Sequence, residues 1–421
     1  MLKSSLGFHT MTLTLNLQTD EARQLLIDFS TYRTNTKLIE MYTKNERGEP
    51  IIYYYKYPLM PLKVDIYFKD KYRGIKWCIR ASKRHSDYVG YIVEVTINPK
   101  FLADINDYLT AASFSDMKFA IINFNNESKK ISPLLYQFKD YKIDRIDYCV
   151  NISLDEFIPE YNSDQILNLI KRSDIPPHYK EWKVYDKTAH RMISKPESFY
   201  LTSKSVNINY YSKYLQLLNK SEENVKNKLK PIDQETIDAS RDIYRFEVQC
   251  KYHKMYSLSQ KTDKEGNPDY NKYKNLLDPV TCIKIVSDYY KKTIGKGDWY
   301  SLSEAEKIIK SQNYNCQREQ KLINALKFVS QCRSLDKAKK ACTKDKIKEF
   351  KNTLNELSKL SINPVTIPRE WNIKHIPNLL RSYFDKLPMA YYEDDLKNMA
   401  MHSCTFRGYQ NYREIFGHSP I

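Results

Sequence analysis

Alternation between apolar and polar residues dominates the first two thirds of the chain. A period of two is typical of a β-strand with one face buried, because successive side chains point to opposite sides of the strand. Runs of this kind predict strands at positions 10–17, 50–57, 63–70, 74–82, 91–99, 145–152, 198–202, 206–213 and 243–251. The chain is therefore expected to be built around a sheet.

Helical periodicity occurs between the first strands. Residues 19–34 predict an amphipathic helix with Thr19 as its N-cap. Residues 99–112 predict a second helix, entered through Pro99. Residues 118–143 suggest a strand followed by a helix. Strands with a few packed helices favour an α+β architecture.

The strand pattern ends near residue 293, and basic helical runs replace it. The first of these runs has Ser301 and Glu304 in capping-box spacing. The predicted fold class is α+β, with a central antiparallel sheet in a catalytic domain and a C-terminal helical basic domain. We divide the chain into an N-terminal α/β part of the catalytic body, the catalytic sheet with a hairpin, and a helical DNA-binding domain, at residues 1–140, 141–292 and 293–421.

The net charge of the chain indicates what kind of partner it binds. Lys and Arg total 68 against 51 acidic residues, which gives a formal net charge of +17. Such a balance favours an anionic partner, and nucleic acid is the most common one. No apolar run is long enough for a membrane-spanning helix, and the N-terminus lacks the apolar core of a signal peptide. We therefore expect a cytoplasmic protein without a membrane partner.

Cysteine and histidine spacing excludes the commonest metal motifs. None of the eight cysteines forms a CxxC pair, so neither a disulfide framework nor a zinc site is expected. The eight histidines show neither HxH nor HExxH. A metal held by histidine is accordingly not predicted.

Three of the predicted strands each carry one polar face. Residues 145–152 place Arg145, Asp147, Cys149 and Asn151 on one side. Residues 243–251 place together Arg245, Glu247, Gln249 and Lys251. The second strand of a predicted hairpin, residues 206–213, places together Asn207, Asn209, Tyr211 and Lys213. If the three strands pair in one antiparallel sheet, its exposed face gathers these polar groups.

Such a face has the groups needed to cut a phosphodiester. Asp147 and Glu247 could hold Mg²⁺ or Mn²⁺ through hard oxygen ligands. Tyr211 could attack a phosphate polarised by that ion and form a phosphotyrosyl intermediate. Lys213 and Arg245 would stabilise the developing negative charge. The expected chemistry is metal-dependent cleavage of a phosphodiester through a covalent phosphotyrosyl intermediate.

Other interpretations of these residues stay open. Antiparallel sheets often carry solvated faces of cross-strand ion pairs, which need no chemistry. The nucleophile could instead be Tyr210, which falls on the apolar side of its strand, or Tyr214, at the start of the next helix. Glu94 could add a third ligand and His253 could act as an acid or base, although a surface carboxylate and a structural histidine are the commoner roles.

The same segments resemble a known family. The runs RIDYCVNI, FYLTSKSVNINYYSK and YRFEVQ are similar, in this order, to motifs of the replication initiators of small rolling-circle plasmids. They also resemble the related relaxases of integrative elements and the gene II-type replication proteins of filamentous phages. The resemblance covers roughly residues 90–255, and the family motifs fall on Arg145, Asp147, Tyr200, Ser203, Tyr211, Lys213, Arg245 and Glu247.

This resemblance implies a metal-dependent, site-specific DNA endonuclease and strand transferase that nicks one DNA strand at an origin. The tyrosine would join the 5′ phosphate, and the released 3′-OH would prime rolling-circle replication. The partners would be double- and single-stranded DNA at an origin, with a host helicase and a homodimer as further expectations. We expect DNA contacts from Arg145, Lys204, Asn207 and Asn209.

The sequence also departs from the family pattern. Asn151 stands where a second Asp is common, Thr202 stands where a hairpin Gly is usual, and no histidine pair of the histidine-metal initiators is present. The alternative functions are a non-catalytic DNA-binding protein for replication or copy control, and a conjugative relaxase.

Overall fold

The protein is described by a computed structural model that covers residues 4–386, except for 47, 53–61, 63, 71–72, 83–89, 105–108, 158–162, 187–189, 196, 227–229 and 260–275. Most of the strand predicted at 50–57 and the residues after 386 lie outside the described residues. The chain forms two compact units. Unit 1 comprises Met1–Ser5, Val150–Val248 and Pro279–Ile421, and unit 2 comprises Leu6–Cys149 and Gln249–Asp278.

The central element is an 11-stranded sheet. In spatial order its strands are β3 (Pro50–Ile52), β2 (Ile39–Lys44), β4 (Ile66–Asp70), β5 (Lys76–Ala81), β6 (Tyr91–Ile97), β1 (Ser5–Leu17), β7 (Lys142–Ser153), β13 (Ile243–Cys250), β12 (Val206–Ser212), β11 (Ser198–Thr202) and β8 (Lys180–Glu181). The boundaries of the two units fall inside β7 and β13. The predicted α+β class with a large antiparallel sheet is confirmed.

Unit 2 surrounds an aromatic core. Its helices are α1 (Thr19–Thr36), α2 (Pro99–Ala103), α3 (Phe114–Ile131) and α8 (Tyr252–Ser259), with short 3₁₀ turns at Pro133–Leu135 and Phe138–Asp140. Phe29 of α1 stacks on Phe68 of β4 with ring centroids 4.1 Å apart, and Trp77 of β5 meets Phe29 edge-on at 5.5 Å. All three rings are fully buried, so they anchor α1 to the sheet.

One expectation for unit 2 was wrong. The strand expected at the start of residues 118–143 is part of the helix α3. Its buried residues are Met117, Ala120, Phe124, Ser128 and Ile131, a spacing of three or four that belongs to a helix. A short apolar run in this segment imitates strand alternation, and only the longer window reveals the helical period.

The ends of two other helices also differ from expectation. Gln18, not Thr19, is the N-cap of α1, because its side chain and that of Glu21 form a reciprocal capping box. Helix α2 stops at Ala103, well before Ala112. The backbone of Ala112 instead pairs with Phe8 through two 2.9 Å hydrogen bonds. This pairing requires a glycine at the preceding position of β1, since a Cβ on Gly7 would lie 1.9 Å from the Ala112 carbonyl oxygen.

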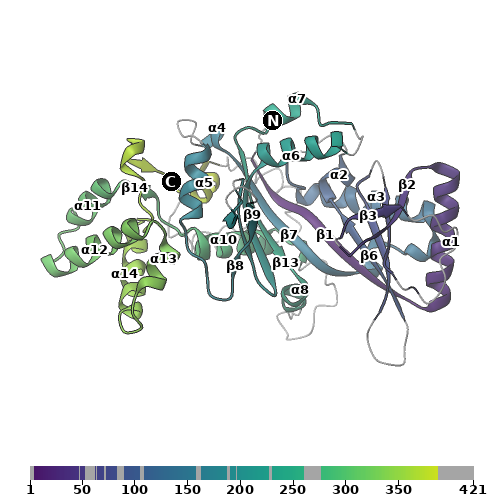
Figure 1. Ribbon diagram of the computed structural model, residues 1–421, viewed down its shortest axis with the longest axis horizontal. Helices are drawn as coiled ribbons and strands as arrows, with labels where there is room; N and C mark the ends of the chain where they lie inside the picture. The colour runs from purple at the N-terminus through teal and green to yellow at the C-terminus, as the bar shows by residue number, and fades with distance from the viewer. Residues whose placement is uncertain are drawn as a thin grey trace. The chain divides into compact units, whose positions relative to one another are not determined.

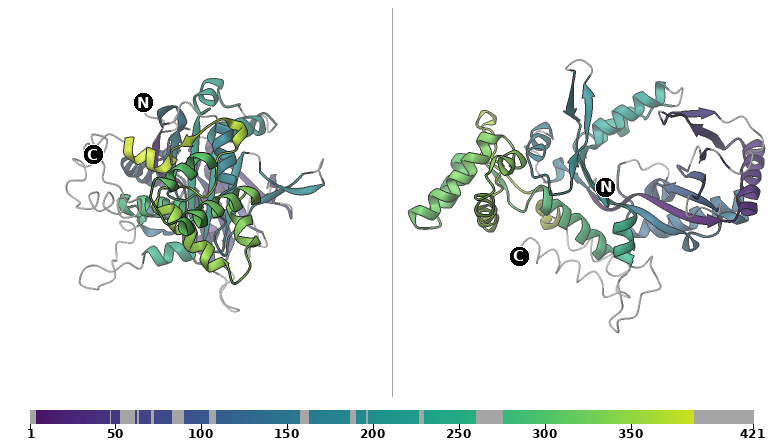
Figure 2. Two further views of the ribbon diagram at one scale, coloured as in Figure 1. Left: turned by 90° about the vertical axis from the view of Figure 1, so that its left-hand side faces the viewer. Right: turned by 60° about the horizontal axis from the view of Figure 1, so that its bottom comes forward.

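Unit 1 combines strands of the sheet with helices. Its helices before residue 300 are α4 (Leu154–Phe157), α5 (Ser163–Lys171), α6 (Lys213–Lys226), α7 (Gln234–Ala239) and α10 (Pro279–Thr293). Strands β9 (Lys183–Asp186) and β10 (Arg191–Ser194) pair as a separate two-stranded ribbon, visible in the right-hand view of Figure 2.

The C-terminal part of unit 1 is helical, as predicted. It contains α11 (Leu302–Lys310), α12 (Cys316–Cys332), α13 (Leu335–Ala341), α14 (Ile347–Lys359) and α15 (Leu379–Lys386), with a 3₁₀ turn at Arg369–Trp371. Helices α11, α13 and α14 each pack on α12, and all appear in green in Figure 1. Ser301 caps α11 by accepting a hydrogen bond from the Glu304 amide, which confirms the predicted start. Among the described residues no helix is long and apolar enough to cross a membrane.

Candidate tyrosine and metal site

The polar faces of the three predicted strands are buried for the most part, so the expectation of an exposed face was wrong. Asp147 on β7 is 1% exposed, Glu247 on β13 is 2% exposed and Tyr211 on β12 is 5% exposed. These strands lie in the interior of the sheet order, and nearly every residue of β7 from Ile146 onward is buried. Buried polar groups need partners, so the contacts of these side chains define what the face can do.

Tyr211 points its hydroxyl at a carboxylate. Its phenol oxygen donates a hydrogen bond to Glu247 Oε2 at 3.3 Å. The neighbouring Tyr210 lies in the core, stacked on Tyr244 with centroids 5.4 Å apart. Complete burial, with smaller contributions from two nearby tyrosines, raises the pKa of Tyr210 well above its ordinary value, so Tyr210 remains a neutral phenol. Among the described residues, the hydroxyl of Tyr211 contacts an acidic group and that of Tyr210 does not.

Tyr214 occupies a different setting. It lies in the first turn of α6 and is half-buried. The guanidinium of Arg241 sits over its ring, 4.9 Å from the centroid. This cation–π contact sets the Tyr214 ring against the Arg241 side chain. The predicted position of Tyr214 at the start of a helix is confirmed.

A histidine joins the two predicted metal ligands. His9 on β1, Asp147 on β7 and Glu247 on β13 each offer a ligand atom, and these atoms all lie within 4.8 Å of one another. The three strands are consecutive in the sheet. This group could hold a metal ion, with two carboxylate oxygens and one imidazole nitrogen as donors. His9 is therefore a candidate ligand that the spacing of the histidines did not predict.

His9 escaped prediction because motif searches look for ligands close together in sequence. His9 lies on β1 and Asp147 on β7, and helices α1–α3 and strands β2–β6 lie between them in the sequence. Only the pairing of distant strands brings the imidazole to the carboxylates. The one local signal was a histidine interrupting the apolar and hydroxyl residues of GFHTMTL.

The two cations predicted to stabilise the reaction, Arg245 and Lys213, each form hydrogen bonds to other side chains of the protein. Arg245 is 1% exposed, and its Nε donates to Asn151 Oδ1 at 2.7 Å. Asn151, the departure from the family pattern, is thus a partner of Arg245. Lys213 is the first residue of α6 rather than a strand residue, and its Nζ donates to Gln216 Oε1 at 3.0 Å.

The predicted DNA contacts are dispersed. Arg145 pairs with Asp147, with Nε 3.0 Å from Oδ1, and thereby offsets one of the two buried carboxylates. Asn207 donates to the Tyr200 hydroxyl at 2.8 Å inside the β11–β12 hairpin, and Asn209 is half-buried opposite Tyr200. Lys204 is exposed in the hairpin turn, about 20 Å along the strand from Tyr211 at ~3.3 Å per residue.

The two secondary candidates take no part in the metal group. Glu94 pairs across strands with Arg80 at 2.8 Å. His253 is exposed on α8, with its ring 5.4 Å from that of Tyr252. Both residues are therefore useful controls for changes at Glu247 and His9.

Comparisons with known proteins yield one solved structure. No family model matches the chain, and no curated protein matches it. The chain is similar to the rolling circle replication initiator protein from Geobacillus stearothermophilus, at 10% identity and a TM-score of 0.30, over 69% of this chain and 85% of that chain. A likeness this weak does not establish a common fold, so the site is argued from its own residues.

Manganese binding tests the proposed ligand group directly. Glu247→Gln and His9→Gln are each expected to weaken Mn²⁺ binding by about 100-fold, because removing a ligand costs at least as much as removing one of its supporting hydrogen bonds. The readout is the electron paramagnetic resonance signal of unbound Mn²⁺ during a titration. Glu94→Gln and His253→Gln should bind like the unmodified protein. Equal binding by all four variants would place the metal elsewhere.

Proposed function

We propose that the protein is a metal-dependent DNA nicking and rejoining enzyme that uses Tyr211 as its nucleophile. The observation that carries the proposal is the hydrogen bond from the Tyr211 phenol to Glu247, a carboxylate that also belongs to the His9–Asp147–Glu247 group. Glu247 therefore connects the candidate nucleophile to the candidate metal group, and its carboxylate is also the candidate proton acceptor. The sequence resemblance to rolling-circle initiators supports the same chemistry.

The proposed reaction exchanges one phosphoester for another. The Tyr211 oxygen attacks the phosphorus of a DNA phosphodiester and forms a new P–O bond to the 5′ phosphate, while the bond from phosphorus to the 3′ oxygen breaks. Glu247 accepts a hydrogen bond from the phenol and is placed to take its proton. The leaving 3′ oxygen gains a proton, so the products are a phosphotyrosyl adduct and a free 3′-OH. Reversal of the same step rejoins the strand.

His9, Asp147 and Glu247 are the residues that would hold the metal. A bound divalent cation would polarise the scissile phosphate and neutralise the charge that develops on its oxygens. The donor set of two carboxylates and one imidazole accepts Mg²⁺ but suits Mn²⁺ better, because imidazole is a softer ligand than oxygen. Arg145 forms an ion pair with Asp147 and would orient its carboxylate toward the metal group.

The biological role proposed from this chemistry is initiation of rolling-circle replication of a plasmid or phage at a DNA origin. The helical C-terminal region, with its excess of lysine, would bind the DNA. A homodimer and a host helicase are proposed as partners on the sequence resemblance alone.

A second function is favoured by one observation. Asp147, Glu247 and Tyr211 are almost fully buried, and a DNA phosphate must reach them for any reaction. A protein that retains the sheet as a scaffold and regulates replication by binding DNA would need no such access. Covalent attachment to DNA separates the two functions.

The test is a nicking assay on a supercoiled plasmid that carries the DNA upstream of the gene. With Mn²⁺ or Mg²⁺ we expect an open-circular product and a protein–DNA adduct that survives SDS, and EDTA should abolish both. Binding of the plasmid without any adduct, at every metal concentration tried, would leave only the scaffold function.

A further inference from the structure

A cavity of about 910 Å³ lies in unit 1 within the C-terminal region. Its walls are the start of α11, the turn between α12 and α13, Arg172 just after α5, and residues 365–370 and 372–374. Val329, Val365 and Ile367 give it a buried apolar lining. Its volume falls within the range of pockets that enclose small ligands, so it can take a few nucleotides but not a double helix.

Four cations line this cavity: Arg172, Arg333, Arg369 and Lys374. In the part of the chain that the structure describes, none of them forms an ion pair with a carboxylate. Two acidic residues also line the cavity, and one of them, Glu306, is already paired with Lys327 at 3.4 Å. Hydroxyl groups that can donate to an anion come from Ser301, Ser303, Ser330, Ser334 and Thr366. The lining therefore has an uncompensated positive charge.

The walls of the cavity are joined by hydrogen bonds. The Ser301 amide donates to the Lys374 carbonyl at 2.8 Å, and the Ile367 amide donates to the Tyr300 carbonyl at 2.9 Å. The Leu335 amide donates to the Arg172 carbonyl at 2.9 Å. Elements from four parts of the sequence are thus held at fixed separations. A preformed cavity loses little entropy when a ligand enters.

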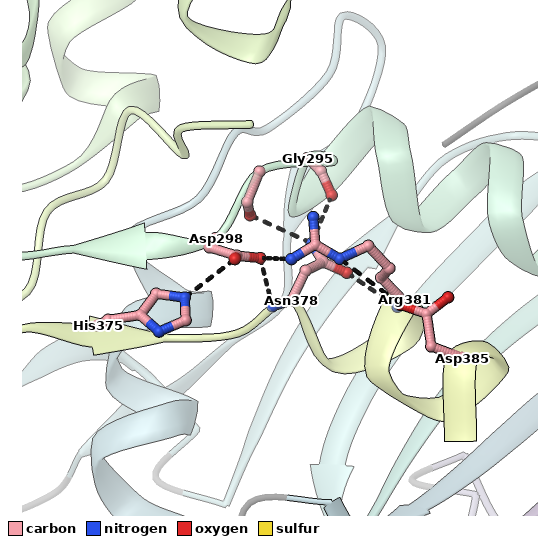
Figure 3. Close-up of polar contacts among 7 residues, drawn as sticks. Gly295, Asp298, His375, Asn378, Arg381 and Asp385 are labelled. Carbon is pink, nitrogen blue, oxygen red and sulfur yellow. Dashed lines mark hydrogen bonds and ion pairs between the residues drawn. The ribbon is translucent and has the colours of Figure 1, made fainter. Parts of the chain in front are cut away.

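A buried carboxylate fixes the wall that carries Lys374. Asp298 accepts hydrogen bonds from His375 Nε2 at 2.9 Å, from the Asn378 amide at 2.8 Å and from Arg381 (Figure 3). Strands β14 (Trp299–Tyr300) and β15 (His375–Ile376) pair beside it, and the Tyr300 and His375 rings stack at 4.7 Å. Since Ser301 and Lys374 directly adjoin this pair of strands, the network sets where Lys374 stands.

We propose that this cavity binds the phosphate groups of single-stranded DNA. Unpaired guanidinium and ammonium groups around a preformed hollow are suited to a chain of phosphates. None of the residues that line it in the described structure is aromatic, so the sugar–phosphate backbone rather than stacked bases would fill it. The inference rests on the proposed function for its ligand and assigns that ligand to a site that does not include Tyr211.

The test compares two triple variants of the full chain. Arg333→Gln with Arg369→Gln and Lys374→Gln removes three exposed cavity cations. Lys37→Gln with Lys118→Gln and Lys129→Gln removes three exposed lysines that lie outside the C-terminal helical region and do not line the cavity. Binding of a labelled single-stranded oligonucleotide, and of its duplex, is followed by fluorescence anisotropy at salt concentrations between roughly 50 and 300 mM. The decline of affinity over this range reports the number of phosphate contacts.

The cavity variant should lose about 100-fold in affinity for the single strand at 0.1 M salt, because each lost contact lowers the salt slope by about 0.7. The control variant should lose less than about threefold, since none of its lysines lines the cavity. Equal losses in the two variants, or a loss confined to the duplex, would overturn the assignment. If the unmodified protein binds no DNA, the proposed function itself fails; if it binds and both variants match it, only the cavity assignment fails.

Discussion

Tyr211→Phe is expected to abolish the covalent protein–DNA adduct, with a fall in nicking rate of at least about 10³-fold. Phenylalanine keeps the ring and its packing but has no oxygen to attack phosphorus. The change removes one hydrogen bond to Glu247, so we expect a loss of only about 1 kcal/mol in the free energy of unfolding. The adduct is measured on SDS gels with end-labelled origin DNA, beside DNA affinity and thermal unfolding.

Tyr210→Phe is the matched control. The Tyr210 hydroxyl is buried and has no hydrogen-bond partner among the described residues, so removing it breaks no hydrogen bond there. Tyr214→Phe tests the remaining candidate. Full adduct formation by Tyr211→Phe, together with its loss in Tyr214→Phe, would move the nucleophile to α6 and leave the proposed reaction otherwise intact.

Asp298→Asn is expected to lower the free energy of unfolding by about 3 kcal/mol at pH 7. The Asp298 carboxylate accepts hydrogen bonds from the His375 ring, the Asn378 amide and the Arg381 guanidinium. An amide cannot neutralise Arg381, whose side chain is only 16% exposed and would remain charged. Denaturant unfolding followed by circular dichroism measures the change.

The pH dependence of this variant follows from the direction of the pKa shift. Burial alone would raise the pKa of Asp298, but the hydrogen bonds from His375 and Arg381, with the Arg381 charge, outweigh burial and hold it below the ordinary value. The unfolded chain protonates this group near about pH 3.9, and the folded protein does so at lower pH. The stabilisation is therefore complete above that range and is lost as the pH falls through the folded pKa. The gap between the protein and Asp298→Asn should narrow below about pH 4.

Asp385→Asn provides the control for that experiment. Asp385 also faces Arg381, at 3.9 Å, but its side chain is 46% exposed. An exposed pair at this distance contributes less than about 0.5 kcal/mol. Equal destabilisation by the two variants would mean that the network is not buried in solution as described.

Local periodicity predicted the strands on which the site is built. The runs at 145–152, 206–213 and 243–251 fall in β7, β12 and β13, except that residues 213 and 251 lie just beyond β12 and β13. The opposite orientations of Tyr210 and Tyr211 follow from the two-residue period alone, because adjacent strand residues must point to opposite faces. The contact of Tyr211 with Glu247 was the expected consequence of bringing two polar faces together.

Burial and distant partners could not be predicted in this way. Alternation suggested that one face of these strands meets water, but a sequence pattern does not reveal what covers a face. Asn151 was identified only as a departure from the family pattern, and its role as the hydrogen-bond partner of Arg245 depends on a strand distant in the sequence. His9 and the cavity that includes Arg172 and Lys374 depend on contacts between segments far apart in the chain, which no local window contains.

Hydrogen bonds and an ion pair join residues 172–174 to the C-terminal helices, and these contacts limit where the chain can be truncated. The Asp174 amide donates to the Thr293 carbonyl at 3.1 Å, and Lys339 pairs with the Asp174 carboxylate at 2.6 Å. Unit 1 is itself assembled from three separated stretches of chain, one of which carries Tyr211. A fragment ending near residue 293 would therefore expose the surface that α13 covers and would lose part of the unit that holds the tyrosine. Inactivity of such a fragment would report damage to its folding as much as loss of a DNA contact, so point substitutions are the sounder way to separate binding from catalysis.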